Sequence, residues 1–119
     1  MMIKSGIKFE SGEIVLVPFP FTNLSQSKRR PVLVLSNSSH NIVSEDFVCC
    51  GITSNLNNKN YSILLESSDL EERTIPKKSR IKFDKIFTLE KSLVVKRLGK
   101  INSKKMNMVQ NSLSSLLSS

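Results

Sequence analysis

The segment SRIKFDKIF, residues 79–87, alternates polar and apolar side chains more cleanly than any other part of the chain. Such alternation predicts a β-strand with one face in the core, because successive side chains of a strand point to opposite sides. Arg80, Lys82 and Asp84 would then share one face, while the apolar side chains between them enter the core. The segment therefore predicts a half-buried strand that carries a row of charges.

Short apolar runs on both sides of this segment predict further strands. We expect the first strand to end near Val17, because prolines at positions 18 and 20 remove backbone donors. Pro31 opens the second strand, and Gly51 indicates either a bulge or a close approach of another backbone near the end of the third. The expected strands are 12–17, 32–36, 46–53, 61–65 and 94–100, the expected polar loops are 21–30, 37–44 and 54–60, and an acidic connection with a helical turn covers 66–72.

A single helix is expected at the C-terminal end of the chain. Asn102 or Ser103 can cap its start, and apolar side chains recur at three- and four-residue spacing from Met106 to Leu117. Several short strands followed by one helix favour a mainly β fold, a small curved barrel or half-barrel on which the helix packs. A chain of 119 residues is one domain. We expect residues 1–10 to form a loose N-terminal extension.

The chain is basic, with a formal net charge of +8 from 18 Lys and Arg against 10 Asp and Glu. This balance favours a polyanionic partner, either nucleic acid or an acidic protein. No apolar run approaches the roughly 20 residues of a membrane span, and the N-terminus lacks the apolar region of a signal peptide. Cys49 and Cys50 are adjacent and predict no disulfide framework, so we expect a soluble protein of the cytoplasm with no membrane partner.

No residue pattern indicates a metal centre or a bound cofactor. The chain has no H-x-x-x-H pair, no C-x-x-C, no carboxylate cluster with ligand spacing, no phosphate-cradling glycine loop and no G-x-S-x-G. A ribonuclease without a metal needs cations or hydrogen-bond donors around the phosphorane, and groups that transfer protons on either side. Arginine, threonine and aspartate are suitable residue types for these tasks.

Several segments occur in an order that resembles a known family. They are GEIVLVPF at 12–19, KRRPVLVLS at 28–36, GITS at 51–54 and KFDKIFTL at 82–89, followed by Gly99. The chain is similar to the MazF/PemK family of toxins. The resemblance implies an SH3-like barrel and a homodimer. It also implies a sequence-specific, metal-independent endoribonuclease that cuts single-stranded RNA by 2′-hydroxyl attack on the adjacent phosphate, needs no cofactor, and is restrained by a small acidic antitoxin.

The resemblance implies functional roles for Arg30 and Thr53. A guanidinium grips a phosphate bidentately and can stabilise the pentacovalent state, and Thr53 can place its hydroxyl on the same phosphate. From the residues alone, Arg30 could equally belong to a solvated basic loop, and a threonine that ends a strand is more often a local donor. Ser54 is a further RNA-binding candidate. Glu13 matches a family position near the RNA groove, although a glutamate that opens an edge strand is usually a solvated end.

Asp84 matches an acidic position that one branch of the family uses for proton abstraction. Arg80 and Lys82 on the same face could hold it ionised beside the substrate. The alternative is a surface ladder of ion pairs. We expect these two cations, together with Lys28 and Arg29, to bind RNA.

Two departures from the family pattern leave other functions open. Lys82 stands where an arginine is usual, and a lysine cannot contact phosphate bidentately. The loop at 25–29 lacks the acidic residue or histidine of many relatives. A barrel that only binds RNA therefore stays an alternative, as does a protein-binding toxin that inhibits DNA gyrase on the same fold.

The remaining chemically distinctive side chains are not assigned to catalysis. His40 is the only histidine, and it lies in an expected exposed loop without an identifiable partner. Cys49 and Cys50 point to opposite faces of a strand, so we expect one in the core and the other half exposed. Neither is assigned as a nucleophile.

Overall fold

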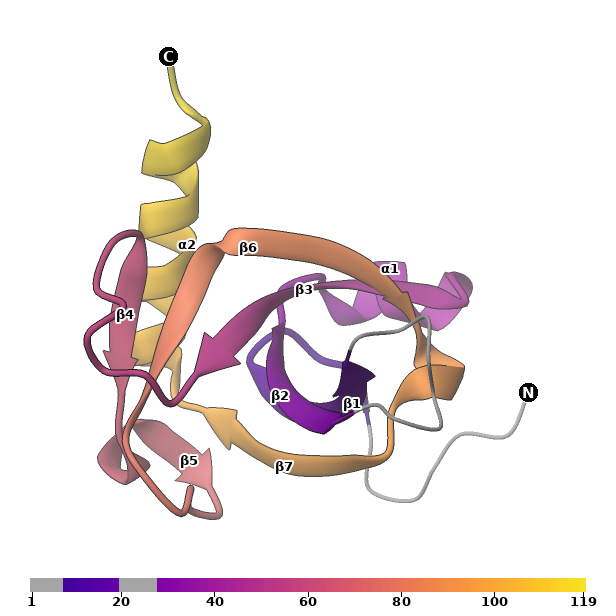
Figure 1. Cartoon of the computed structure of the whole chain (residues 1–119). Coiled ribbons are helices and arrows are strands. Elements are labelled where there is room, and N and C mark those ends of the chain that lie inside the picture. Colours follow the sequence, from indigo (N-terminus) through magenta and orange to yellow (C-terminus); the bar gives the residue numbers. More distant parts are fainter. Residues whose placement is uncertain (1–7, 20–27) are drawn as a thin grey trace.

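A strongly curled antiparallel sheet forms the body of the protein (Figure 1). The computed structural model describes residues 8–19 and 28–119; residues 1–7 and 20–27, which include most of the first predicted loop, lie outside the described residues. Within this part of the chain seven strands follow the order β4-β6-β3-β2-β1-β7-β5 across the sheet. The elements are β1 (Glu13–Phe19), β2 (Lys28–Val34), α1 (Ser38–Val43), β3 (Asp46–Thr53), β4 (Ser62–Leu65), η1 (Ser67–Asp69), β5 (Leu70–Glu72), β6 (Ser79–Glu90), η2 (Lys91–Leu93), β7 (Lys96–Ile101) and α2 (Ser103–Leu117). The prediction of a mainly β half-barrel with a C-terminal helix is confirmed.

The curled sheet carries a hydrophobic cluster on each face. Cys49 belongs to one cluster and Cys50 to the other, as the alternation of a strand requires. Both cysteines are fully buried, so the expectation of one half-exposed cysteine is wrong. The first cluster is Phe9, Val15, Val17, Val32, Val34, Phe47, Cys49, Leu89 and Val94; the second is Ile14, Leu33, Cys50, Ile52, Ile63, Leu65, Ile81, Ile101, Met106 and Val109.

Part of the expected N-terminal extension belongs to the domain. Phe9 is buried, and its ring centroid lies 5.3 Å from that of Phe47. Glu10 forms an ion pair with Lys100 on β7, with 2.8 Å between the Oε2 and Nζ atoms. The prediction of a loose extension is therefore wrong for these two residues, because an apolar ring and a paired carboxylate attach them to the barrel.

Helix α2 packs on its own barrel through its first turns. Asn102 is the N-cap, and its side-chain oxygen accepts a hydrogen bond from the backbone N–H of Lys105 at 2.8 Å. Met106 and Val109 are buried in the second cluster, whereas Leu117 near the end is 76% exposed. Figure 1 shows the yellow C-terminal end of the helix projecting beyond the sheet.

Strands β1 and β2 extend further than the sequence predicts. β1 continues beyond Val17 through Pro18, and β2 begins at Lys28, so Pro31 lies inside a strand. Arg30 consequently lies in a paired strand opposite Val17, and not in the predicted exposed loop. The register of β7 along β1 ends before Pro18, and that of β3 along β2 ends before Pro31. Both prolines are therefore tolerated, because each lies where the strand is paired on one side.

A short helix replaces the polar loop predicted at 37–44. Asn37 caps helix α1, because its side-chain oxygen accepts from the backbone N–H of His40 at 2.9 Å. Among its six residues only Asn41 is buried. A helix that buries one polar side chain leaves no apolar period, which explains why the sequence does not reveal it. His40 is exposed, as expected.

The bulge predicted at Gly51 is present, and its extra residues lie on the neighbouring strand. Ile86 of β6 pairs with Cys50, whereas Lys82 pairs with the next residue, Gly51. Residues 83–85 are therefore left over on β6, which bends at this point. Asp84 is the middle residue of this bulge.

Candidate functional site

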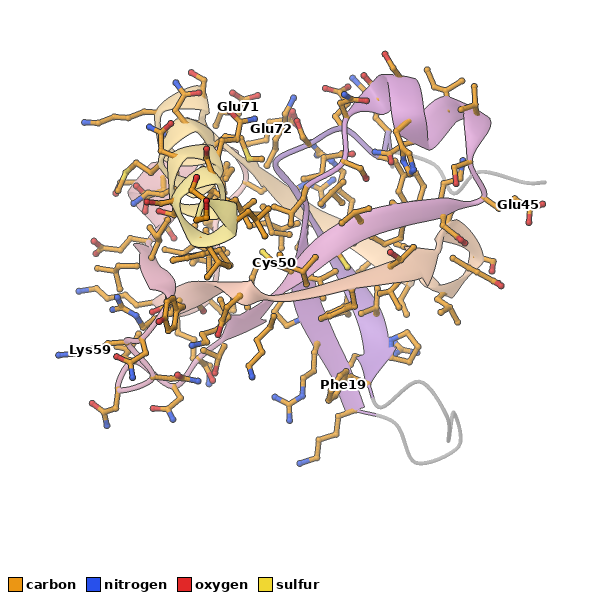
Figure 2. All side chains as sticks on the ribbon, turned by 90° about the horizontal axis from the view of Figure 1, so that it is seen from above. Phe19, Glu45, Cys50, Lys59, Glu71 and Glu72 are labelled. Atoms are coloured by element: carbon orange, nitrogen blue, oxygen red, sulfur yellow. The ribbon has the colours of Figure 1, made fainter. Side chains whose placement is uncertain are left out.

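A pocket of about 490 Å³ lies beside the β6 bulge and is lined by all three predicted catalytic residues. Arg30 from β2, Thr53 from the end of β3 and Asp84 from the bulge all line it. Figure 2 shows Phe19, another lining residue, at the outer end of the β1–β2 hairpin. The remaining walls are mainly apolar and include Pro31, Val32, Ile52, Ile86 and Phe87. The fold thus brings together three residues that are far apart in the sequence.

Arg30 is an exposed cation on a fixed strand. Its guanidinium carbon lies 5.9 Å from the centroid of the Phe19 ring, within the range of a cation–π contact. Arg30 also borders a second hollow of about 310 Å³, which Arg29 and Ser54 line as well. Lys28 is exposed at the start of the same strand. A phosphate bound by Arg30 would therefore have basic or polar groups toward both hollows.

Thr53 has a hydroxyl that still has a proton to donate. Its oxygen accepts a hydrogen bond from the backbone N–H of Asn55 at 3.1 Å, and a hydroxyl can accept and donate simultaneously. Arg80 lies opposite Thr53 in the sheet, but its Nε donates to the hydroxyl of Ser62 on β4 at 2.7 Å. Among the described residues Arg80 is not part of the pocket wall.

Lys82 lines the same pocket, but most of its side chain is buried and its ammonium is bound by the protein. The residue is only 6% exposed, and its ammonium donates to the side-chain oxygen of Asn58 at 3.1 Å and to the carbonyl of Asn60. It also lies 3.6 Å from the Oδ1 atom of Asp84. A buried ammonium requires such partners, because desolvation without them is expensive. The geometry therefore directs Lys82 at the loop before β4 and at Asp84.

Asp84 presents an oxygen with unused hydrogen-bonding capacity. Its side chain is 27% exposed, but its Oδ1 atom is buried and, within the described chain, accepts no hydrogen bond. Buried carboxylate oxygens are nearly always hydrogen bonded, so each exception needs an explanation. The Oδ1 atom faces the Lys82 ammonium, and the exposed part of the same carboxylate is what a ligand in the pocket can reach.

Glu13 lies away from this group. Its carboxylate is fully buried, pairs with Arg97 of β7, and accepts from the backbone N–H of Glu10 at 2.8 Å. β1 is an interior strand between β2 and β7, so the expectation of a solvated end on an edge strand is wrong. The buried ion pair ties β1 to β7.

The cysteines have the properties of core residues. Burial raises the pKa of the Cys50 thiol to about 12, and burial likewise raises the pKa of Cys49. The nucleophilic thiolate form is therefore suppressed at neutral pH.

Over residues 8–19 and 28–119, no group of three or more His, Cys, Asp and Glu side chains is placed to hold a metal ion. No helix in that part of the chain is long and apolar enough to cross a membrane.

Phe19, Asn58 and Lys85 are among the residues of the pocket wall that the sequence did not single out. Phe19 follows a proline at a predicted strand end, where an aromatic residue has no distinctive pattern. Asn58 lies in the polar run NLNNKN at 55–60, whose composition indicates a turn and does not single out one asparagine.

Comparison with known proteins supplies the family context. A family model described as PemK-like, MazF-like toxin of type II toxin-antitoxin system matches residues 10–117. The chain is similar in structure to MazF from Deinococcus radiodurans, with 24% identity, 91% and 94% of the two chains covered, and a TM-score of 0.71. It is similar to an endoribonuclease in complex with its cognate antitoxin from a mycobacterial species, with 21% identity, 91% of each chain covered, and a TM-score of 0.71. A mycobacterial endoribonuclease gives 20% identity, 98% and 95% coverage, and a TM-score of 0.72. No curated protein matches the sequence.

Proposed function

The chain belongs to the PemK-like, MazF-like toxins of type II toxin-antitoxin systems, and from this we propose that it is a sequence-specific endoribonuclease. It cuts single-stranded RNA without a metal ion, by attack of a ribose 2′-hydroxyl on the adjacent phosphate. The observation that carries this proposal is the meeting of Arg30, Thr53 and Asp84 in one pocket wall. A cation, a hydroxyl donor and a carboxylate supply three of the tasks in this reaction, in which the P–O5′ bond breaks, a 2′,3′-cyclic phosphate forms and the departing 5′-oxygen takes a proton from water.

Each residue has a distinct task in the proposed mechanism. Asp84 accepts the proton of the attacking 2′-hydroxyl through its carboxylate, whose side chain is 27% exposed in the pocket wall. Arg30 binds the non-bridging phosphate oxygens, and Thr53 donates its hydroxyl proton to one of them. Because the pentacovalent state carries more negative charge than the ground state, these contacts stabilise it preferentially.

Basic residues around the second hollow bind the flanking RNA. Arg29 and Ser54 line that hollow, and Lys28 lies on the same strand as Arg29. Contacts of cations with phosphates release counterions, so binding weakens as salt concentration rises. Glu13 and Arg80 are left out of this surface, because both side chains are bound inside the protein.

An acidic antitoxin is the proposed protein partner of the toxin, which acts as a homodimer. A solved structure at 21% identity is an endoribonuclease bound to its cognate antitoxin, which supports this assignment. With a formal net charge of +8, the toxin attracts an acidic chain to the basic surface around Arg30. Inhibition would then be competitive with RNA, and a partner that left Arg30 accessible would contradict it.

The test is cleavage of a long mixed-sequence RNA in EDTA by the wild-type protein and the Arg30→Ala and Thr53→Ala variants. We expect discrete cuts that resist EDTA and disappear with Arg30→Ala. The matched control is Lys104→Ala, which removes an exposed cation on α2, outside both hollows. Cleavage that is unchanged in folded Arg30→Ala protein would refute the assignment. RNA that is bound but stays whole would favour an RNA-binding barrel, and gyrase inhibition with intact RNA would favour a protein-binding toxin.

A further inference from the structure

Asn58 is held in the pocket wall by three of its four hydrogen-bonding groups. Its backbone N–H donates to the carbonyl of Asn55 at 3.1 Å, and its own carbonyl accepts from the hydroxyl of Ser62 at 3.0 Å. Its side-chain oxygen accepts from the Lys82 ammonium at 3.1 Å. Backbone and side chain are thus fixed together.

The contact with Lys82 also determines which way the Asn58 amide faces. An ammonium group has donors only, so the oxygen of the amide must point toward it. The Nδ2 group is therefore the part of the side chain left for a ligand, and within the described chain it has no hydrogen-bond partner. Asn58 consequently offers a donor of known chemistry at a fixed place in the pocket wall.

The loop that carries Asn58 is ordered by a chain of local hydrogen bonds. Asn55 donates from its backbone to the Thr53 hydroxyl at 3.1 Å, and its side chain accepts from the backbone of Asn57 at 3.1 Å. Lys59 donates from its backbone to the Asn57 carbonyl at 2.9 Å, and its own carbonyl, 2.8 Å from the Ser62 hydroxyl, shares that proton with the Asn58 carbonyl. A donor on such a loop loses little conformational entropy when a ligand binds, which favours selectivity.

The rest of the pocket has the composition of a nucleobase site. Apolar side chains such as Ile52, Ile86 and Phe87 supply surfaces that can cover the face of a ring. Proteins that read single-stranded RNA cover splayed bases in this way and recognise them by hydrogen bonds to their edges. The pocket also contains Arg30 and Asp84, so a base bound there would lie next to the scissile phosphate.

We propose that Asn58 determines sequence specificity by reading one unpaired base, with its Nδ2 group donating to an acceptor on the base edge. This inference rests on the proposed function, since it assigns a base next to the cut. A base that places an amino group at the same position is rejected, because two donors would then face each other. Lys82 is a positioning residue that keeps the amide in this orientation.

The experiment converts the donor into an acceptor without removing the contact with Lys82. In Asn58→Asp, one carboxylate oxygen still accepts from the ammonium, and the other replaces the NH₂ group. Asn57→Asp is the matched control, because it adds the same charge to the same loop outside the pocket wall. Each protein is incubated in EDTA with an RNA that carries a randomised segment, and the fragment ends are sequenced.

We expect Asn58→Asp to change the preferred base at one position of the cut site, by about tenfold, toward a base that presents an amino group. The other positions and the Asn57→Asp profile should match the wild type. Asn58→Ala should flatten the preference at the same position, which covers the case in which the added carboxylate merely repels RNA. If both Asn58 variants kept the wild-type preference at every position, at whatever rate, the inference would be overturned.

Failure of the inference is distinguishable from failure of the nuclease assignment. Arg30→Ala tests cleavage itself, independently of which base is preferred. If the wild-type protein binds RNA without cutting it, the same variants are compared by sequencing the RNA that each retains. A shift at one position would again support a reading role for Asn58, and identical retained sequences would overturn it. Absence of both cutting and binding by the wild-type protein would overturn both proposals.

Discussion

Replacing Glu13 by alanine should destabilise the barrel severely, although this residue lies outside the pocket wall. The carboxylate is 0% exposed and pairs with Arg97, whose side chain is 9% exposed. The same carboxylate accepts from the backbone N–H of Glu10 at 2.8 Å. Arg97 reaches a second carboxylate, on Glu72, at 2.9 Å. The alanine variant therefore leaves a buried cation with one remaining partner and a backbone donor with none.

The magnitude follows from burial. Removing one partner of a buried ion pair costs about 3–5 kcal/mol, because the other charge is left uncompensated. Glu72 is half exposed and still pairs with Arg97, so the lower figure of about 3 kcal/mol applies. Domains are stable by only about 5–15 kcal/mol. At about 4 °C for each kcal/mol in a chain of this size, Tm should fall by roughly 12 °C.

Urea unfolding followed by circular dichroism measures this loss, provided that the dependence on urea concentration is unchanged. Glu72→Ala is the matched control, because it removes the half-exposed partner of Arg97. It should lower the free energy of unfolding by less than about 1 kcal/mol. The double variant Glu13→Leu with Arg97→Met should recover much of the loss, because no buried charge is left unpaired. If Glu13→Ala cost no more than Glu72→Ala, the role given to this ion pair would be refuted.

A second Glu13 variant distinguishes a structural role of this residue from a contact with RNA. Glu13→Gln keeps the shape of the side chain, and we expect the folded variant to cut RNA at the wild-type rate. A selective loss of cutting with no loss of stability would instead support the RNA-binding role that sequence resemblance implies for Glu13.

Three further predictions concern packing, pH and thiol reactivity. Gly99→Ala should lower the free energy of unfolding in urea by about 1–3 kcal/mol, because the added carbon would lie 2.8 Å from Leu70 Cδ2 and 2.9 Å from the Glu72 carbonyl. Gly51→Ala is the milder control, because its added carbon would meet only Lys85 Cβ, at 3.7 Å. The hydrogen bond from Lys100 lowers the pKa of Glu10, and the same bond raises the pKa of Lys100. The pair therefore stabilises the fold fully between about pH 4.5 and pH 10.5, and this contribution is lost as pH falls through the lowered pKa or rises through the raised one. Lys100→Met should remove that part of the pH dependence of the urea midpoint, and an unaltered profile would contradict it. Because burial raises the pKa of Cys50 to about 12 and raises that of Cys49 too, neither thiol should react with a disulfide reagent at pH 8 until urea unfolds the protein; rapid reaction of the native state would show that the core opens.

The sequence predicted the boundaries of elements that begin or end at a capping residue or with a change from apolar to polar residues. The strand at 46–53 has the predicted bounds, and Asn102 caps the helix that follows β7. The ends of β1 and β2 could not be predicted in the same way. Whether a strand accepts Pro18 or Pro31 depends on which neighbours pair beside it, and that is a property of the whole sheet.

In the candidate site too, some features could be predicted from the sequence and others depend on the whole sheet. The roles proposed for Arg30, Thr53 and Asp84 came from a resemblance between ordered motifs, and the fold places all three around one pocket. Alternation alone placed Lys82 and Asp84 on an exposed face of charges. The bulge at 83–85 interrupts that alternation, because it inserts three unpaired residues opposite a single step of β3. Lys82 precedes the bulge, and it is buried by the loop before β4, whose residues Asn58 and Asn60 bind its ammonium and which no local period encodes.

Lysine at position 82 also has a physical consequence that an arginine would not have. An ammonium is compact and donates in three directions, so it can serve an amide oxygen, a backbone carbonyl and a nearby carboxylate together. Here it donates to Asn58 and Asn60, and the nearby carboxylate, 3.6 Å away, is that of Asp84. One buried cation thus holds both the loop proposed to read a base and the carboxylate proposed to accept the proton. Substitutions at Asn58 and Asp84 should therefore be non-additive in cutting rate, because each changes the partners of the same ammonium and so moves the other group.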